Sequence, residues 1–209
     1  MSRRKLTLFG VVLLYGICGA ASCPLFDWHP LLLPIPFGVI SALLFLRSAR
    51  AILVVPLYIL VWFAAFSVAM EMGMFWTPQS DYLPMCIAGS IGGLGVCLAS
   101  GIVNRCLLSP RYLLGAGLVG CVAALPFVLW LAQKNAAERL SMNATGDAWQ
   151  PLRFLCSFAV WQAGVGTYLY AVCTECRRKR DAVAVAFQGQ ATKPPEIPFT
   201  TRNRGAHAR

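Results

Sequence analysis

The sequence predicts an all-α integral membrane protein, a bundle of six transmembrane helices with the N-terminus and the C-terminus both cytoplasmic. Three observations lead to this prediction. Hydrophobic residues make up 58% of the 209 residues and charged residues only 12%, whereas about a quarter of an ordinary soluble domain is charged. The uncharged residues fall into six runs, and Lys and Arg cluster in every second gap between them.

Each run reaches or nearly reaches the roughly 20 residues that cross a hydrocarbon core about 30 Å thick. Spans are expected near 6–23, 31–46, 51–70, 83–103, 112–132 and 152–173, so that residues 1–176 form one six-span transmembrane domain. The second span is short, and Pro34 and Pro36 remove backbone donors near its start. We expect it to be tilted, kinked or partly re-entrant.

The basic residues predict the orientation. Fifteen of the 18 lie at the N-terminus, in the second and fourth loops and in the C-terminal tail, which all fall on one side. By the positive-inside rule this side is cytoplasmic. Indole rings favour the membrane interface. Four tryptophans fall at the expected outer boundary, in agreement with this orientation: Trp28, Trp76, Trp130 and Trp149.

The first span has an alternative interpretation as a cleavable signal. Basic residues precede it, and Ala20-Ala21-Ser22-Cys23 resembles a weak bacterial lipoprotein box ending at Cys23. Cleavage would leave five spans and a new N-terminus outside. The position three before the cysteine holds Ala20, where a larger aliphatic residue is usual, so the six-span interpretation is preferred.

Residues 177–209 are predicted to form a basic, largely disordered cytoplasmic tail, because the Pro- and Gly-containing end from Gln188 to Arg209 has a composition typical of disorder. Arg177, Arg178, Lys179 and Arg180 follow the sixth span directly. They serve either as a stop-transfer anchor or as a contact for anionic lipid, where each cation is worth about 1 kcal/mol.

Nine cysteines raise the question of metal or redox chemistry. Cys173-Thr174-Glu175-Cys176 is the only CxxC, and no second CxxC or nearby His completes four ligands. A zinc or dithiol role and, in a eukaryotic host, acylation of these thiols are alternatives to a structural role. On the outer side a disulfide could join two of Cys23, Cys86 and Cys156 in an oxidising compartment.

No Asp, Glu, Lys or Arg lies in the middle of a span, which disfavours proton-coupled transport. His29 and His207 both lie outside the spans, which excludes bis-histidine haem. We therefore expect no catalytic, metal or cofactor site and no enzyme activity. The net charge of +10 is explained by residues that flank spans, so nucleic acid is not an expected partner.

Two features inside the spans remain as candidates for function. The mid-span polar residues Ser90, Ser100, Gln162 and Thr167 either bond between helices or contact a solute. Small residues recur at four-residue spacing in the fourth and fifth spans, as in Gly89/Gly93 and Ala116/Gly120. Such spacing allows close approach of a neighbouring helix, either within the bundle or in a homo-oligomer or a complex with another membrane protein.

The sequence thus predicts a non-enzymatic assembly, accessory or structural subunit of the cell membrane, plasma or inner, that acts through helix packing and contact with the lipid bilayer. The alternative is a small transporter or channel for a neutral or weakly polar solute. The sequon at Asn143, in the longest outer loop, would carry sugar only in a host that glycosylates proteins.

Overall fold

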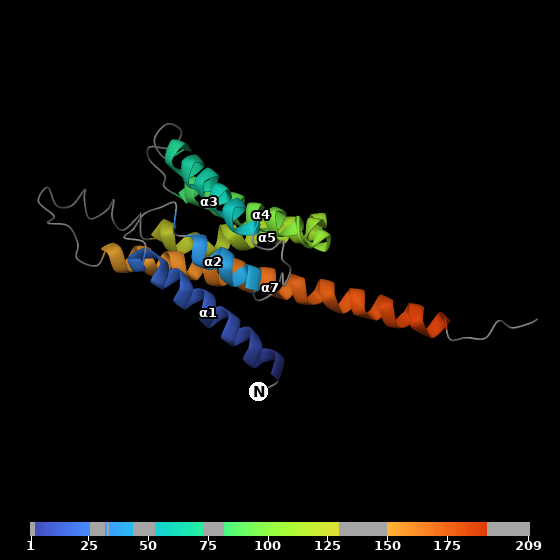
Figure 1. The fold of residues 1–209 in the computed structure, drawn as a ribbon. Helices are drawn as coiled ribbons and strands as arrows, with labels where there is room; N and C mark the ends of the chain where they lie inside the picture. The colour runs from blue at the N-terminus through green and yellow to red at the C-terminus, as the bar shows by residue number, and fades with distance from the viewer. Residues whose placement is uncertain are drawn as a thin grey trace, which may run out of the picture. The chain divides into compact units, whose positions relative to one another are not determined.

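The computed structural model describes residues 3–25, 32, 34–43, 53–72, 82–129 and 150–191. Within these ranges every regular element is helical, as predicted (Figure 1). The elements are α1 (Arg3–Leu25), α2 (Pro34–Ser41), α3 (Val54–Glu71), α4 (Tyr82–Gly101), a 3-10 turn η4 (Arg105–Leu108), α5 (Pro110–Ala123) and α7 (Gln150–Ala191). Contacts between Cα atoms divide the chain into two units, Met1–Cys176 and Arg177–Arg209.

Two helices of the described residues are long and apolar enough to cross a membrane. They are Leu83–Gly101, with a mean hydropathy of 1.7, and Pro110–Leu129, with 2.1. The apolar helices Thr7–Ala21 and Val54–Ala69 are shorter, and the 8 residues of α2 rise only about 12 Å. The all-α membrane class is therefore supported at this coarser level, and six spans remain a proposal.

Prolines explain where two helices begin or break. Pro34 is the first residue of α2, a position where its missing N–H group would have no helical partner in any case. α5 ends at Ala123, and five further helical residues follow Ala124. Pro126 lacks an N–H group and its ring clashes with the carbonyl of Val122, which breaks the helix there.

The structure differs from the sequence prediction in the tail. Disorder was expected from Arg177, but the helix continues to Ala191. Residues 177–191 are rich in Ala and Arg, which favour helix, and the first proline after them is Pro194. The part of the predicted tail from 192 to 209 lies outside the described residues.

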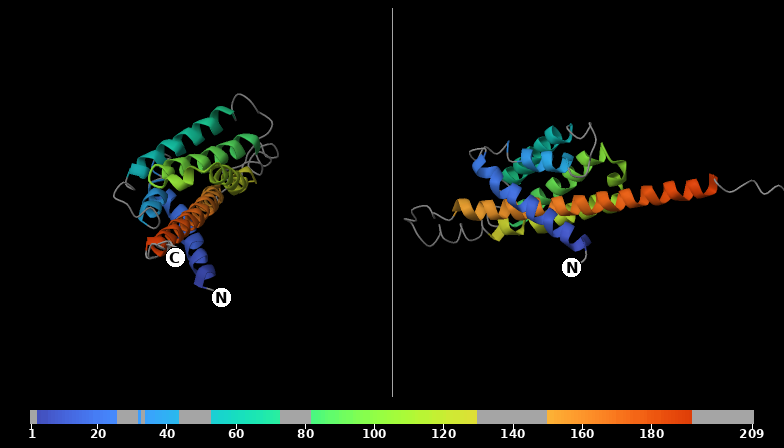
Figure 2. Two further views of the ribbon diagram at one scale, coloured as in Figure 1. Left: turned by 90° about the vertical axis from the view of Figure 1, so that its right-hand side faces the viewer. Right: turned by 60° about the horizontal axis from the view of Figure 1, so that its bottom comes forward.

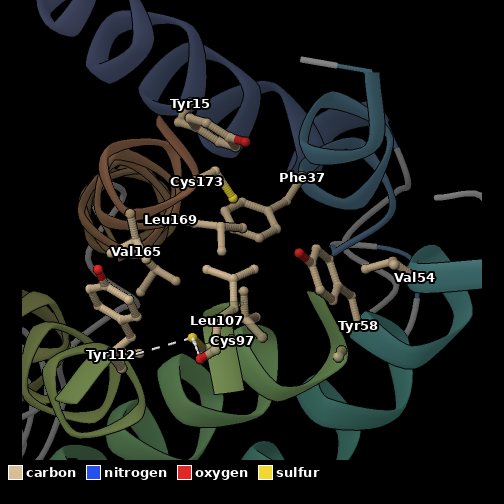
Figure 3. Packing of buried hydrophobic residues seen from close by; sticks show 14 of the residues in the cluster. Tyr15, Phe37, Val54, Tyr58, Cys97, Leu107, Tyr112, Val165, Leu169 and Cys173 are labelled. Atoms are coloured by element: carbon tan, nitrogen blue, oxygen red, sulfur yellow. Dashed lines mark hydrogen bonds between the residues drawn. The ribbon is translucent and has the colours of Figure 1, made fainter. Parts of the chain in front are cut away.

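The core of the first unit receives side chains from all of its helices (Figure 3). The rings of Tyr15 and Tyr58 flank Phe37, at centroid distances of 5.0 and 5.5 Å. Leu107 and Leu169 are fully buried beside them. Figure 2 shows α4 lying between α3 and α5, the two helices that contact it most. α4 is therefore the central helix of this packing.

Candidate functional site

The contact between α4 and α5 is made by backbone atoms. A Cβ atom on Gly93 would lie 2.2 Å from the carbonyl oxygen of Ala116, and one on Gly120 would lie 2.1 Å from that of Gly89. No side chain fits at either position, so the glycines are needed for this approach. We call these four residues the α4–α5 seam. The close approach expected from the sequence is present, and both sides of it belong to the same chain.

Other glycines of α4 make room for side chains instead. A Cβ on Gly92 would lie 2.8 Å from the Trp161 ring, and one on Gly95 would lie 2.5 Å from Val61. Trp161 belongs to α7 and Val61 to α3, so Gly92 and Gly95 lie on the sides of α4 that pack against these two helices. The same residue type thus serves two different purposes on one helix.

Ser100 takes part in a buried hydroxyl network. Its Oγ donates to the Val96 carbonyl at 2.7 Å and lies 2.6 Å from the Tyr58 hydroxyl. Because a hydroxyl group has one hydrogen, Tyr58 must be the donor to Ser100. A second pair, Tyr15 and Ser41, is joined at 2.8 Å, and Ser41 neighbours Tyr58 as well. These hydroxyls link α1 to α4, and Ser100 therefore has an interhelical structural role.

Gln162 lacks such a partner. Its side chain is 1% exposed, yet neither amide atom has a hydrogen-bond partner, and the same holds for Trp62 Nε1 and Thr167 Oγ1. The interhelical hydrogen bond considered for Gln162 is therefore not formed within the part of the chain that the structure describes. Ser90 is half-buried on α4, with its carbonyl oxygen facing Gly117.

Two small cavities share part of their lining, and Gln162 borders the smaller one. The larger cavity, of about 100 Å³, is apolar. Its wall is formed by α3, α4 and α7 and by the residues that follow α5. The smaller, about 10 Å³, is lined by Gln162. Trp62, Gly92 and Trp161 line both cavities. Of the four polar residues singled out from the sequence, Gln162 alone lines either one, and we call the two cavities with Gln162 the Gln162 site.

Sequence reasoning missed Trp62 as a member of this site. A signal was present, because Trp62 falls in the middle of the third predicted span, whereas the indole groups used to orient the chain lie at its boundaries. Its ring packs edge-on against Phe158 at 5.0 Å and Trp161 at 6.1 Å. Together these rings form an aromatic wall next to the Gln162 amide.

The cysteine pairing differs from the one considered on the outer side. The structure joins Cys106 to Cys176, with their Cα atoms 6.1 Å apart, while Cys86 and Cys156 are free thiols. The Cys23 side chain lies outside the described ones. In this structure Cys176 is bonded to Cys106 rather than lying free beside Cys173, and Cys173 itself is buried.

The basic cluster of the second unit is exposed at all four positions, Arg177, Arg178, Lys179 and Arg180. No group of three His, Cys, Asp or Glu side chains that could hold a metal ion occurs within the described ranges. The predicted outer tryptophans and Asn143 lie outside these ranges.

Within the described residues, fold and site together define an all-α protein with two apolar helices of membrane-spanning length, a core closed by small residues and hydroxyls, and the small cavities of the Gln162 site. Comparison of the chain with protein-family models, with curated proteins and with solved structures gives no match. The function is therefore argued from the residues themselves.

Proposed function

We propose that the protein is a non-enzymatic multi-pass membrane subunit, with six spans and both termini cytoplasmic, that acts in assembly or structural support through helix packing and lipid contact. One observation carries the proposal. The outer face of α5 presents a stripe of large apolar side chains, with Leu114 68%, Leu118 69% and Val122 63% exposed. Water would disfavour so much apolar surface, whereas lipid chains accept it.

The interior supports the same proposal. Transport of a solute needs a path with polar groups along it, but the hydroxyls of Tyr58 and Ser100 bond to each other and the seam glycines face backbone. The helix-packing motif of the fourth and fifth spans is thus used within the chain. A partner in the membrane would meet the α5 stripe rather than the glycines.

Photo-crosslinking tests this role. A benzophenone side chain placed at Leu118 should give one discrete protein adduct in native membranes, while the same group at Phe9 on α1 serves as the matched exposed position and should give lipid adducts. The proposal fails if Leu118 yields only lipid adducts and the purified monomer alone moves a neutral solute into liposomes.

The transporter alternative is favoured by a single observation, the buried Gln162 amide beside a cavity. Flux assays in proteoliposomes decide between the two proposals. Solute uptake that Gln162→Leu abolishes and Thr167→Val preserves would favour transport.

The orientation makes a separate prediction about the Cys106–Cys176 pair. These cysteines lie at the ends of the spans that are expected to be cytoplasmic, where thiols stay reduced. We expect both to react with a membrane-permeant maleimide in intact cells, to resist an impermeant one, and to form the disulfide after oxidation of isolated membranes. A disulfide already present in cells quenched with acid would instead place the basic ends in an oxidising compartment.

A further inference from the structure

The Gln162 site has the features of a small-ligand site, and we infer that it binds a neutral amphiphile: an apolar body about the size of one aromatic ring that carries a single hydroxyl or carbonyl oxygen. The inference does not depend on the accessory role proposed above. It rests on the unpartnered polar atoms of Gln162 and Trp62 together with the apolar cavity that adjoins them.

The polar atoms require an occupant. Gln162 presents an amide oxygen and an NH₂ group, and Trp62 an indole N–H, all buried and without a hydrogen-bond partner among the residues that the structure describes. An unpartnered polar group in an apolar interior is costly, and within a bilayer no bulk water is present to satisfy it. The 10 Å³ cavity that Gln162 and Trp62 both line has room for about one oxygen-sized group.

The apolar body follows from the larger cavity. An enclosed apolar cavity of about 150 Å³ accepts benzene. The larger cavity here has about 100 Å³ and is partly open, so a single ring can lie in it with one edge outside. Its wall contains Phe66, Phe127 and Trp161, which offer faces and edges to a ring. Trp62 and Trp161 border both cavities, so one molecule can place its ring in the larger cavity and its oxygen beside Gln162.

The charge of the ligand follows from the residues that border it. Among the described residues that line the two cavities there is no Asp, Glu, Lys, Arg or His. A charged ligand would lose its hydration there and gain no counter-ion. The amide and the indole together provide both donors and an acceptor, so either a hydroxyl or a carbonyl oxygen is satisfied.

Two probes of almost equal shape test the inference, p-cresol and p-xylene, which differ only in a hydroxyl in place of a methyl group. Their binding to the detergent-purified full chain is measured as the concentration-dependent rise of the thermal midpoint. Because one buried hydrogen bond separates them, we expect the apparent Kd for p-cresol to be about tenfold lower.

Three variants assign this difference to the site. Gln162→Leu should remove the preference for p-cresol, and Trp62→Phe, which keeps a ring and deletes the donor, should reduce it. Thr167→Val is the matched control, because it deletes another unpartnered polar group from α7 and should leave the preference unchanged. Ala88→Leu, which adds carbon atoms to the wall of the larger cavity, should abolish binding of both probes.

Several outcomes would overturn the inference. They are equal responses of the wild type to both probes, a preference that persists in both Gln162→Leu and Trp62→Phe, or an ordered water at Gln162 that p-cresol does not displace. Organic extraction of protein purified without probe identifies the source of the ligand. A membrane-derived amphiphile copurifies with the wild type and is absent from Ala88→Leu, whereas a water-soluble one is lost during washing.

Discussion

Glycine residues serve two different kinds of packing on the two sides of α4. On the side of α5, Gly93 and Gly120 allow carbonyl groups to approach a neighbouring backbone, and only Gly89 at one end of this contact also borders the larger cavity. On the side of α3 and α7, Gly92 makes room for the Trp161 ring, and cavities and unpartnered polar atoms remain beside it. A glycine stripe therefore does not by itself distinguish a helix seam from a binding site. What the facing helix presents decides which one forms.

The strongest test of this contrast adds one methyl group to α5. Gly120→Ala places a Cβ atom 2.1 Å from the Gly89 carbonyl oxygen, which belongs to the backbone and cannot rotate away. We expect a loss of about 3 kcal/mol of unfolding free energy, measured by denaturation in mixed micelles. Gly117→Ala is the control, because its Cβ would have 3.9 Å to the nearest atom. It should be neutral or stabilise by up to about 1 kcal/mol. Equal losses would mean that the seam is not tightly packed.

A second test makes the same substitution, alanine to valine, once at the larger cavity and once at the α4–α5 seam. Ala65 borders the larger cavity, whereas Ala116 is fully buried and its carbonyl faces Gly93. Ala65→Val adds two carbon atoms to open space and should change the stability by less than about 1 kcal/mol, in the stabilising direction. Ala116→Val should cost about 2 kcal/mol. The helix-propensity penalty of valine is the same in both variants and cancels in the comparison. Thermal midpoints that fall equally would argue that the cavity is already filled.

Some of this arrangement was readable in the sequence. The helix starts lie within about three residues of the predicted span starts, because charged residues are costly in hydrocarbon and mark where an apolar helix can begin. The ends agree less well, since α5 ends at Ala123 and α7 continues to Ala191. A close approach of a neighbouring helix was predicted from the small residues that permit it, but which helix would be the neighbour was left open. Both predictions depend on the position of a residue along its own helix.

The remaining features depend on which side chains meet between helices. The sequence pattern does not give the rotation of one helix relative to another. Ser100 and Gln162 look alike as mid-span polar residues, yet Ser100 meets Tyr58 and Gln162 meets no polar partner. The Cys106–Cys176 pair was not considered, because only Cys23, Cys86 and Cys156 on the outer side were weighed for a disulfide. The helical part of the tail was missed because the disorder argued for the proline-containing end was extended back to Arg177.

A third test compares a paired with an unpaired buried hydroxyl. Ser100→Ala leaves the Tyr58 hydroxyl without the acceptor that it has at 2.6 Å, and should cost about 1–2 kcal/mol. A double-mutant cycle with Tyr58→Phe should give a coupling energy of about 1 kcal/mol, within the range of buried hydrogen bonds in membrane proteins. Thr167→Val removes a hydroxyl that has no partner and should cost nothing or stabilise the fold. A coupling energy of zero would show that the network is not needed for packing.

The smallest change in unfolding free energy is expected at the exposed ion pair between α5 and α7. Arg111 and Glu175 form an ion pair of 2.8 Å, with side chains 57% and 47% exposed, and the Arg111 guanidinium lies 4.3 Å from the centre of the Tyr112 ring. Glu175→Gln should cost no more than about 0.5 kcal/mol of unfolding free energy, because solvent weakens an exposed pair.

Salt should reduce even this cost, since exposed charges are screened, while the loss in Gly120→Ala should not respond to salt. Unfolding of both variants at low and high ionic strength measures this difference. A large, salt-insensitive loss in Glu175→Gln would mean that lipid or a partner shields the pair, and that this end of α5 and α7 belongs with the dry interior rather than with the surface.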